Sequence, residues 1–443
     1  MEKPGEAATL SFPEAVAVTS MVRTMRVLIH TIGSAGDVHP FIGVGAALKA
    51  RGHEVHVITG AVFERAVRDS GLEFHPLGTT EDFDRLRGNP DLWHPRKAFK
   101  VIIQGAADPS YAPILEITRK LHDPGNTVIL ASSLAFGARN ARELLGIPMA
   151  TVHLAPSLFP SVHRQPELHG MIFGQKAPRV LKAIQWWFGG RVVDHHVLPG
   201  LNRFRREHGL PPARNLLRDW WHSPDRVIAL FPEWFASPQP DWPRQTRVTG
   251  FPLFDERGIR EVPEAVREFL DAGEPPVIFT PGSAMAHGDV FFREAVKALK
   301  RTGRRGILLS PFIETIPADL PDHVRHFSYV PFSEVLPRAA ALVYHGGIGT
   351  CAQALRAGIP HLVQPMAHDQ LDTLSRVRDL GVGLGLVPAK FTDQRIAAVL
   401  DRLLTDPGFK TRALEVARRF EPEAWLRRTC EEVEALGAQG PAR

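Results

Sequence analysis

The sequence predicts an α/β protein built from two doubly wound domains, each with a parallel sheet. Three observations carry this prediction. A chain of 443 residues is too long for one ordinary hydrophobic core. Strand–helix–strand patterns occur in both halves, first at residues 25–59 and again at 342–363. Between the halves, residues 232–263 are rich in proline and carry no clear periodicity, which indicates a connection between domains.

The composition is that of a globular protein, with 44% apolar and 23% charged residues. Only Cys351 and Cys430 are present, so a disulfide framework is excluded and a reducing, cytoplasmic location is expected. The apolar runs fall short of the roughly 20 residues that a membrane helix needs. Residues 1–24 lack the basic start of a signal peptide and are predicted to be a disordered extension.

The formal net charge of +5 and the pI near 9.3 leave two interpretations open. The basic residues are spread along the chain, which favours an ordinary solvated surface. The alternative is a weak attraction to diphosphate substrates or to an anionic membrane, as a peripheral protein. Nucleic acid is not expected as a partner, since no zinc-finger or RNA-recognition signature is present.

In the first half, residues 25–31 are predicted to form a strand, 33–37 a turn and 38–51 a helix that Gly52 ends. The strand at 54–59 completes the βαβ unit. The turn lacks G-x-G-x-x-G spacing, so a dinucleotide site is not supported. The remaining predictions for this half are a helix at 62–70, a loop-rich segment at 78–113, strands at 127–132 and 149–153 around a helix at 135–145, an irregular segment at 156–224, and a last strand at 227–231.

The second half repeats the alternation of strands and helices. Expected here are a strand at 276–280, a turn at 281–283, a helix near 289–302, strands at 306–310 and 324–330, and closing helices at 392–405 and 407–436.

The most informative stretch is residues 342–370, LVYHGGIGTCAQALRAGIPHLVQPMAHDQ. A short apolar strand is followed by a glycine-rich turn, a helix that Gly358 and Pro360 end, and a second strand. The turn aims free N–H groups and the positive end of a helix dipole at a ligand, which suits an anion such as a diphosphate. His345 and Thr350 flank this turn, and Asp369-Gln370 is a pair suited to holding sugar hydroxyls.

Singly, a glycine turn and an Asp-Gln pair are common in α/β proteins, but their order and spacing resemble the donor-binding signature of glycosyltransferase family 1. The resemblance implies that His345, Gly347, Gly349 and Thr350 hold the diphosphate of a nucleotide sugar and that Asp369 and Gln370 bind its sugar. It covers most of residues 25–440 and implies the GT-B architecture, two Rossmann-like domains facing a cleft. The domains would be 25–235 for the acceptor and 264–420 for the donor, joined by 236–263, with a helix at 421–443 packing back on the first domain.

The string GSAGDVHPFIGVGAALKARGH, starting at Gly33, resembles the acceptor loop of bacterial antibiotic and sterol glycosyltransferases of this family. The resemblance implies that Asp37 is the catalytic base, with His39 in reserve and Gly36 facing the acceptor. Plant relatives pair a histidine with an aspartate, but Ser132-Ser133 stands where that aspartate is expected. The residues alone favour an N-cap role for Asp37 and a surface position for His39, and only the resemblance reverses that order for Asp37.

On the donor side, Ser283 is either a diphosphate ligand or an ordinary turn residue. Tyr329 and Val330 stand where plant members carry the Trp-Ala that stacks on the base, although an aromatic there also suits core packing. Gln353 replaces a glutamate that holds ribose hydroxyls, so both UDP-sugars and dTDP-sugars remain open as donors. No metal site and no cofactor beyond the sugar donor is expected, since the histidines are scattered.

Seven of the eight tryptophans precede residue 245, which indicates an apolar acceptor pocket or simply a core. The acceptor candidates are Trp93, Phe99, Phe173 and Trp187. The strings PDLWHPRKAF, FPEWFASPQPDWP, VTGFPLFD and IGSAGDVHPFIG resemble the rhamnosyltransferases of rhamnolipid synthesis, which implies transfer of glucose or rhamnose to a lipid, flavonoid, sterol or polyketide-like hydroxyl. Two alternatives stay open: a nucleotide-sugar epimerase on the same fold, and a non-catalytic nucleotide-sugar-binding partner.

Overall fold

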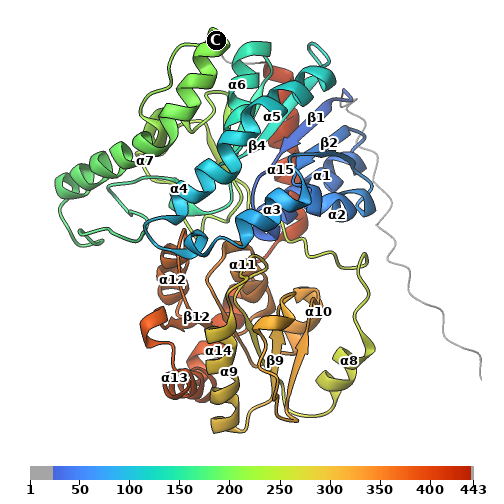
Figure 1. Ribbon diagram of the computed structural model, residues 1–443, viewed down its shortest axis with the longest axis vertical. Coiled ribbons are helices and arrows are strands. Elements are labelled where there is room, and N and C mark those ends of the chain that lie inside the picture. Colours follow the sequence, from blue (N-terminus) through green and yellow to red (C-terminus); the bar gives the residue numbers. More distant parts are fainter. Residues whose placement is uncertain (1–22, 441–443) are drawn as a thin grey trace, which may run out of the picture.

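The computed structural model describes residues 23–440, which form two α/β domains stacked one above the other (Figure 1). Each domain holds one sheet, with seven strands in the first and six in the second, and every strand pair is parallel. The predicted fold class, two doubly wound domains, is therefore confirmed. The expected extension at residues 1–24 lies almost wholly outside the described residues.

The first sheet has the strand order β3-β2-β1-β4-β5-β6-β7. Its strands read as near-continuous apolar runs because helices cover both faces of a parallel sheet, and the central β4 is buried along its whole length. The strands are β1 (Arg26–His30), β2 (Glu54–Thr59), β3 (Glu73–Pro76), β4 (Thr127–Ser132), β5 (Met149–His153), β6 (Arg226–Ala229) and β7 (Thr246–Val248).

The helices of the first domain lie in two layers, one on each face of this sheet (Figure 1). The longer ones are α1 (Ala35–Ala50), α2 (Glu64–Asp69), α3 (Thr80–Arg87), α4 (Ala98–Ile102), α5 (Asp108–Leu121), α6 (Phe136–Leu145) and α7 (Arg179–Glu207). Short turns of helix add η1 (Ala61–Phe63), η2 (Pro90–Trp93), η3 (Ile103–Ala107), η4 (Pro156–Leu158) and η5 (Leu216–Trp220).

Three predictions for this half are wrong. The segment 78–113 is largely helical: α3 begins at a capping box in which Thr79 and Asp82 bond each other. The segment 156–224 contains α7, a helix of 29 residues that tolerates Pro199 inside it. The sheet does not end at residues 227–231, since β7 pairs with β6 from within the proline-rich connection.

The second sheet has the order β10-β9-β8-β11-β12-β13. Its strands are β8 (Val277–Thr280), β9 (Gly306–Leu309), β10 (Val324–Phe327), β11 (Ala341–Tyr344), β12 (His361–Val363) and β13 (Gly383–Gly385). The helices are α8 (Glu264–Asp271), α9 (Asp289–Thr302), α10 (Phe332–Val335), α11 (Ile348–Ala357), α12 (Gln370–Asp379), α13 (Asp393–Thr405), α14 (Pro407–Ala417) and α15 (Pro422–Gln439), with short turns at η6 (Ile313–Thr315), η7 (Leu336–Arg338) and η8 (Pro388–Lys390).

The final helix α15 leaves the second domain and packs on the first, against α1 and the strands β4, β5 and β6 (Figure 1). Its buried side chains Cys430, Val433 and Leu436 join the core under α1. At the surface, Arg51, which directly follows α1, donates to Glu434 over 2.6 Å. The chain therefore crosses between the domains twice, near residue 250 and near residue 421, where Trp425 packs directly on Gly250.

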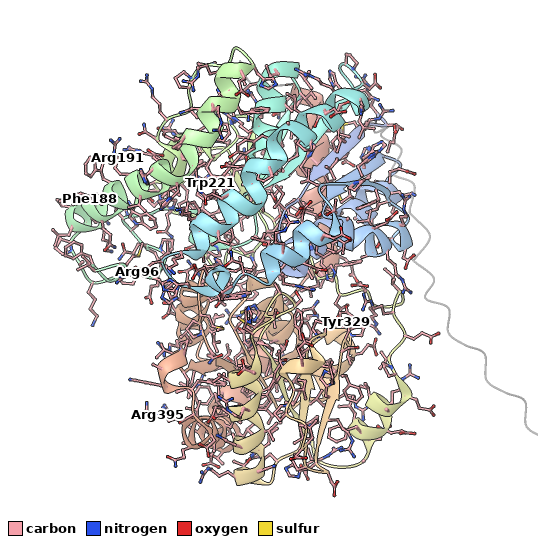
Figure 2. The ribbon with its side chains drawn as sticks, viewed as in Figure 1. Arg96, Phe188, Arg191, Trp221, Tyr329 and Arg395 are labelled. Carbon is pink, nitrogen blue, oxygen red and sulfur yellow. The ribbon has the colours of Figure 1, made fainter. Side chains whose placement is uncertain are left out.

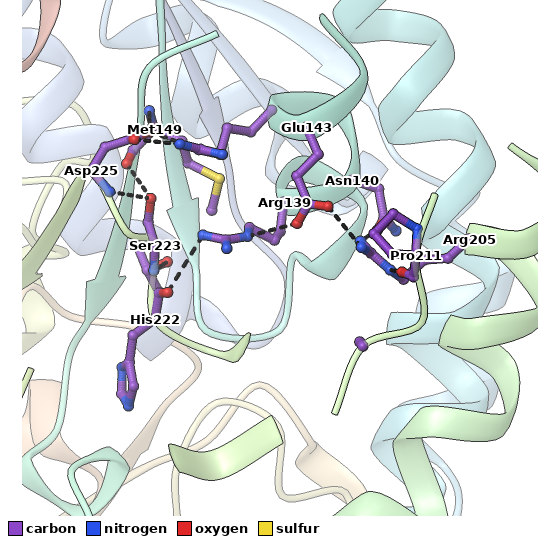
Figure 3. A network of polar contacts seen from close by, with 12 residues as sticks. Arg139, Asn140, Glu143, Met149, Arg205, Pro211, His222, Ser223 and Asp225 are labelled. Carbon is purple, nitrogen blue, oxygen red and sulfur yellow. Dashed lines mark hydrogen bonds and ion pairs between the residues drawn. The ribbon is translucent and has the colours of Figure 1, made fainter. Parts of the chain in front are cut away.

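A polar network fixes the C-terminal end of α7 to the body of the first domain (Figure 3). The buried Arg205 guanidinium donates to Asn140 and Glu143 of α6, at 2.9 and 2.7 Å, and to the Pro211 carbonyl at 2.7 Å. Glu143 in turn accepts from Arg139, at 3.1 Å. These contacts all lie near residue 205. They therefore fix the C-terminal end of α7, and the N-terminal end takes no part in this network.

Candidate active site

The two glycine-rich turns meet at the boundary between the domains. The first precedes α1 and the second precedes α11, and both follow the carboxyl ends of central strands, where ligands bind in doubly wound sheets. A Cβ placed on Gly349 would lie only 3.7 Å from the Cα and carbonyl oxygen of Gly36. That carbonyl lacks an intrahelical donor because Pro40 has no N–H. The N-termini of α1 and α11 are therefore in contact.

Asp37 lies in the first turn of α1, since the helix begins at Ala35 and not at residue 38. The N–H and the hydroxyl of Ser34 both donate to Asp37 Oδ2, at 2.8 and 3.0 Å. Burial raises the pKa of the Asp37 carboxyl above its usual range, and the two bonds from Ser34 oppose that rise. The residue keeps some exposure to solvent, and no further bond to its carboxylate is recorded among the described residues.

His39, the expected reserve base, has a partner of its own. Its Nε2 lies 3.2 Å from Glu256 Oε1, and its ring meets the edge of Phe254 at 5.5 Å. Glu256 also accepts from Arg260 over 2.8 Å. These contacts connect α1 to the segment that joins the domains, so the position of His39 suits a structural contact better than proton transfer.

The His345 ring is held between glycines of two neighbouring turns. A Cβ on Gly282 would lie 2.8 Å from its Cε1, and one on Gly347 would lie 2.4 Å from its Nε2. Burial, with a smaller effect of His368, lowers the pKa of His345 to about 4, so the ring is neutral at pH 7. Its Nδ1 is buried and has no protein partner among the described residues.

Trp93 comes from η2 of the first domain and covers this histidine. Its ring centroid lies 6.4 Å from that of His345 and 5.5 Å from that of His368, both in edge-on contacts. Its Nε1 is also buried without a partner in the described part of the chain. The sequence placed Trp93 among the acceptor candidates, whereas in the structure it lies against the second turn.

Asp369 and Gln370 stand at the start of α12, beside the same turn. Burial and then the charge of Asp37 raise the pKa of Asp369 to about 7, so the two carboxylates are close enough to interact. Gln370 Oε1 accepts from the N–H groups of Met366 and Ala367, at 2.7 and 3.0 Å. The oxygen of Gln370 therefore holds the loop before α12, and its amide nitrogen is the atom that could bind a ligand.

The remaining donor candidates line the second domain around the turn. Ser283 is exposed next to Gly282, and Thr350 lies half-buried in the first turn of α11. Gln353 is buried one turn further along the same helix. Tyr329 donates to the Asp255 carbonyl at 2.7 Å and carries Arg260 over its ring at 4.4 Å, while Val330 is core.

The acceptor candidates are not brought together as one group. Phe99 packs against the first-domain core, and its ring lies 6.4 Å from that of His196. The carbonyl of Phe173 accepts from Gln185 of α7 at 3.1 Å. Trp187 is 62% exposed and contacts Phe188 on the outer face of α7. A cavity of about 460 Å³ does open beside Trp93, lined by His94, Pro95, Arg96, His169 and Gly170.

Three residues of the site were not anticipated from the sequence. His368 has a positive φ of 57° and contacts Trp93, and its place before Asp369-Gln370 was the available signal. Ser34 holds the carboxylate of Asp37, which the Ser-x-x-Asp spacing could have indicated. Glu256 binds His39 from more than two hundred residues away, and no local pattern reveals such a partner.

The arrangement combines a carboxylate with a raised pKa, a neutral histidine and an uncapped helix N-terminus. Gly347, the N-cap of α11, has no side chain to satisfy the first N–H groups of that helix. Such a terminus binds anions. Within residues 23–440, no three His, Cys, Asp or Glu side chains are grouped to hold a metal ion.

Comparison with known proteins identifies the family. Residues 27–163 match the N-terminal domain of glycosyltransferase family 28, and residues 314–432 match the C-terminal domain of erythromycin biosynthesis protein CIII-like proteins. The glycosyltransferase GtfC of Amycolatopsis orientalis is 30% identical over 404 residues, 89% of this chain and 93% of the relative. The chain belongs to the GT-B glycosyltransferases.

Two further comparisons agree with this assignment. The O-mycaminosyltylonolide 6-deoxyallosyltransferase of Streptomyces fradiae is 29% identical over 421 residues, 92% of this chain and 96% of the relative. The spinosyn rhamnosyltransferase SpnG, solved with thymidine diphosphate, superposes with a TM-score of 0.64 at 20% identity, over 92% of this chain and all of that one. This glycosyltransferase is therefore a sugar-transferring enzyme that uses nucleotide sugars. The family 1 signature identified the fold and reaction class, although the model matching the first half is that of family 28.

Proposed function

We propose that this glycosyltransferase moves a sugar, with inversion and without a metal, from a UDP- or dTDP-sugar to a hydroxyl of an apolar acceptor. The observation that carries the proposal is the meeting of the two helix N-termini at Gly36 and Gly349. It places the carboxylate of Asp37 within electrostatic reach of Asp369. A proton acceptor and a sugar-binding carboxylate thus share one site with an anion-binding turn.

The proposed reaction is a single displacement. Asp37 takes the proton of the acceptor hydroxyl, whose oxygen attacks the anomeric carbon from the side opposite the diphosphate. The bond between that carbon and the diphosphate oxygen breaks, and the nucleoside diphosphate leaves toward the first N–H groups of α11. His345, being neutral, donates a hydrogen bond to the departing oxygen, and these fixed donors stabilise the negative charge. A single displacement inverts the anomeric configuration.

A dTDP-deoxyhexose is the favoured donor, with rhamnose the leading sugar. Gln353 stands where a glutamate would accept from both ribose hydroxyls, and a buried amide makes weaker demands on the 2′-hydroxyl. The names of SpnG and of the Streptomyces fradiae relative, a rhamnosyl- and a 6-deoxyallosyltransferase, point in the same direction. Asp369 and the free amide nitrogen of Gln370 would orient the sugar.

The acceptor is proposed to be apolar and bulky, such as a lipid, sterol, flavonoid or polyketide. The cavity lined by His94, Pro95, Arg96, His169 and Gly170 supports this choice, because His94 directly follows Trp93, whose ring lies against His345. Phe99 and Phe173 remain candidates for its deeper wall. A cytoplasmic location remains the expectation drawn from the two buried, free cysteines.

A donor and acceptor panel tests the proposal. The purified enzyme is incubated with UDP-glucose or dTDP-rhamnose, each with hydroxy-fatty-acid, sterol and flavonoid acceptors, and products are followed by mass spectrometry and by proton NMR of the anomeric centre. The proposal requires a new glycoside of inverted configuration. Conversion of donor alone would instead indicate an epimerase, and saturable donor binding without any product would indicate a binding partner.

A further inference from the structure

The N-terminal half of α7 projects from the first domain as an arm (Figures 1 and 2). The C-terminal end of α7 is fixed by Arg205. The inner face of the arm is fixed by the loop that precedes the helix. Lys182 donates to the His163 carbonyl at 3.2 Å, and Trp186 Nε1 donates to the Ser161 carbonyl at 3.1 Å. The arm is therefore held in place, and its outer face is presented to solvent in one orientation.

That outer face is apolar, although it is exposed. The side chains at positions 180, 184, 187, 188 and 192 recur at helical spacing, so they form one stripe. Ile172, on the loop beside the helix, extends it, because its N–H is held by Gln185 at 2.7 Å. The stripe consists of Ile172 (85% exposed), Val180 (70%), Ile184 (45%), Trp187 (62%), Phe188 (60%) and Val192 (58%).

This grouping is not a random scatter of surface residues. In the described part of the chain, eleven large apolar side chains are exposed, and six of them lie in this stripe. Single exposed apolar residues need no explanation, but a contiguous patch marks a contact surface. Aromatic rings beside aliphatic chains are typical of surfaces that enter the boundary between lipid head groups and acyl chains.

Charge decides between the possible occupants. From Leu168 to Val193 the sequence has no acidic residue, while it has Lys176, Arg179, Lys182 and Arg191. Lys176, Arg179 and Arg191 are exposed around the stripe, and Figure 2 shows Arg191 beside Phe188 on the arm. A second copy of the chain would bring the same cations face to face, which is unfavourable. An anionic surface matches both the cations and the apolar stripe.

We propose that the outer face of α7, together with Ile172, docks on an anionic phospholipid bilayer. The rings of Trp187 and Phe188 enter the interface while Arg179 and Arg191 contact the phosphate groups. This is attachment to one face of a membrane, and within residues 23–440 no helix is long and apolar enough to cross one. The inference stands apart from the proposed sugar transfer, because it concerns a surface that carries none of the Asp37–Asp369 site.

Vesicle flotation tests it with the full chain. Vesicles of equimolar phosphatidylglycerol and phosphatidylcholine should bind the protein, and vesicles of phosphatidylcholine alone should bind it much less. Trp187→Ser/Phe188→Ser should lower the partition coefficient at least about tenfold. Arg179→Gln/Arg191→Gln should lower it roughly 25-fold, at about fivefold per cation, and added salt should also lower it. Ile313→Ser is the matched control, an equally exposed apolar residue (65%) in the second domain, and should bind like the parent chain.

Three results would overturn the proposal: equal binding to neutral and anionic vesicles, unchanged binding of both α7 variants, or no binding by the parent chain. Sedimentation velocity provides the last distinction. If the chain forms a concentration-dependent dimer that Trp187→Ser/Phe188→Ser abolishes, the stripe is covered by a second copy and the lipid assignment is wrong. Circular dichroism shows whether each variant is folded, and the charge variant, which leaves the apolar stripe unchanged, tests the proposal independently.

Discussion

The turn before α1 and the turn before α11 occupy matching places at the carboxyl edges of the two sheets, but they leave their helix N-termini in different states. In the first, Asp37 lies within the helix and accepts from Ser34, so the terminus is closed by its own carboxylate. In the second, the N-cap is Gly347, which has no side chain, and the ring against it is that of the neutral His345. One turn supplies a base and the other leaves room for an anion.

This difference shows how one local motif serves two halves of a reaction. Each turn uses glycine next to its helix, and a Cβ on Gly349 would come within van der Waals contact of the Gly36 backbone, at 3.7 Å. The chemistry then depends on a few flanking groups, Ser34 and Asp37 on one side, His345 and Thr350 on the other. The predictions below separate the roles of the two turns.

The largest effect is expected from Asp37→Asn, which keeps the size of the side chain and removes the base. The turnover number should fall by about 10²–10⁴, the usual contribution of a general base. Affinity for the donor, measured by calorimetry with the nucleoside diphosphate, should change less than about twofold. Substantial turnover in this variant would mean that another residue is the base. The first turn would then not supply the proton acceptor, and the comparison of the two turns would be wrong.

The second effect concerns Asp369, whose pKa of about 7 lies well above the usual value of a carboxyl. Between roughly pH 4 and 7 the folded form binds more protons than the unfolded form, so the free energy of unfolding should fall as the pH rises. Asp369→Asn should remove this fall and be more stable than the parent chain by about 2 kcal/mol at pH 8, half the ideal value because the carboxyl retains contact with solvent.

Urea denaturation at several pH values measures this difference. Asp372→Asn is unsuitable as a control because Asp372 is paired with Arg376. Asp379→Asn is the better control. Its carboxylate pairs with Arg164, but this pair is exposed at the surface and contributes little to stability, so the pH dependence of the stability of this variant should follow that of the parent chain. Equal slopes for the parent and Asp369→Asn would mean that the pKa of Asp369 is not raised in the folded chain.

The third effect tests the second turn. Gly347 has a backbone conformation that any residue adopts, but an added methyl group would lie 2.4 Å from the Nε2 of His345. Gly347→Ala should therefore displace the ring and weaken donor binding about tenfold, the loss of roughly one hydrogen bond. In the first turn, the methyl group of Gly36→Ala would meet only the Ser34 hydroxyl, at 3.6 Å. Gly36→Ala should bind the donor with the affinity of the parent chain. If Gly36→Ala and Gly347→Ala lose the same donor affinity, the proposed difference between the two turns is wrong.

The sequence predicted the two turns well because each lies between a buried apolar strand and a helix, which are local signals. The long helix α7 was missed for physical reasons. Pro178, the Gly189-Gly190 pair and Pro199 interrupt its pattern, and its exposed apolar stripe contradicts the usual alternation. Its stability comes from distant partners of Arg205, which a local window does not contain.

The residues of the site could likewise be predicted only where they belong to a local motif. Asp37, His345 and Asp369 could be selected from motif order, since each follows a strand end. The pairing of His39 with Glu256 and the packing of Trp93 on His345 depend on how the domains meet. Both are contacts between segments separated by more than two hundred residues, and spacing along the chain carries no information about them.

The smallest effect, and the sharpest test of the first turn, is expected from Ser34→Ala. The substitution removes the hydrogen bond from the hydroxyl to Asp37 and keeps the one from the N–H of residue 34. Losing the hydroxyl bond should raise the pKa of Asp37 further, because that bond favours the charged carboxylate. The rising limb of kcat/KM against pH should then move upward by about 0.5–1 pH unit, and α1 should lose about 1 kcal/mol of stability with its cap.

Thr79→Ala is the matched control, since Thr79 and Asp82 form the same capping box at α3. Thr79→Ala should lose a similar amount of stability and keep the pH profile of the parent chain. If the rising limb of kcat/KM moves in Ser34→Ala alone, Ser34 adjusts the pKa of the base. If both variants keep the parent profile, Ser34 acts only as a helix cap.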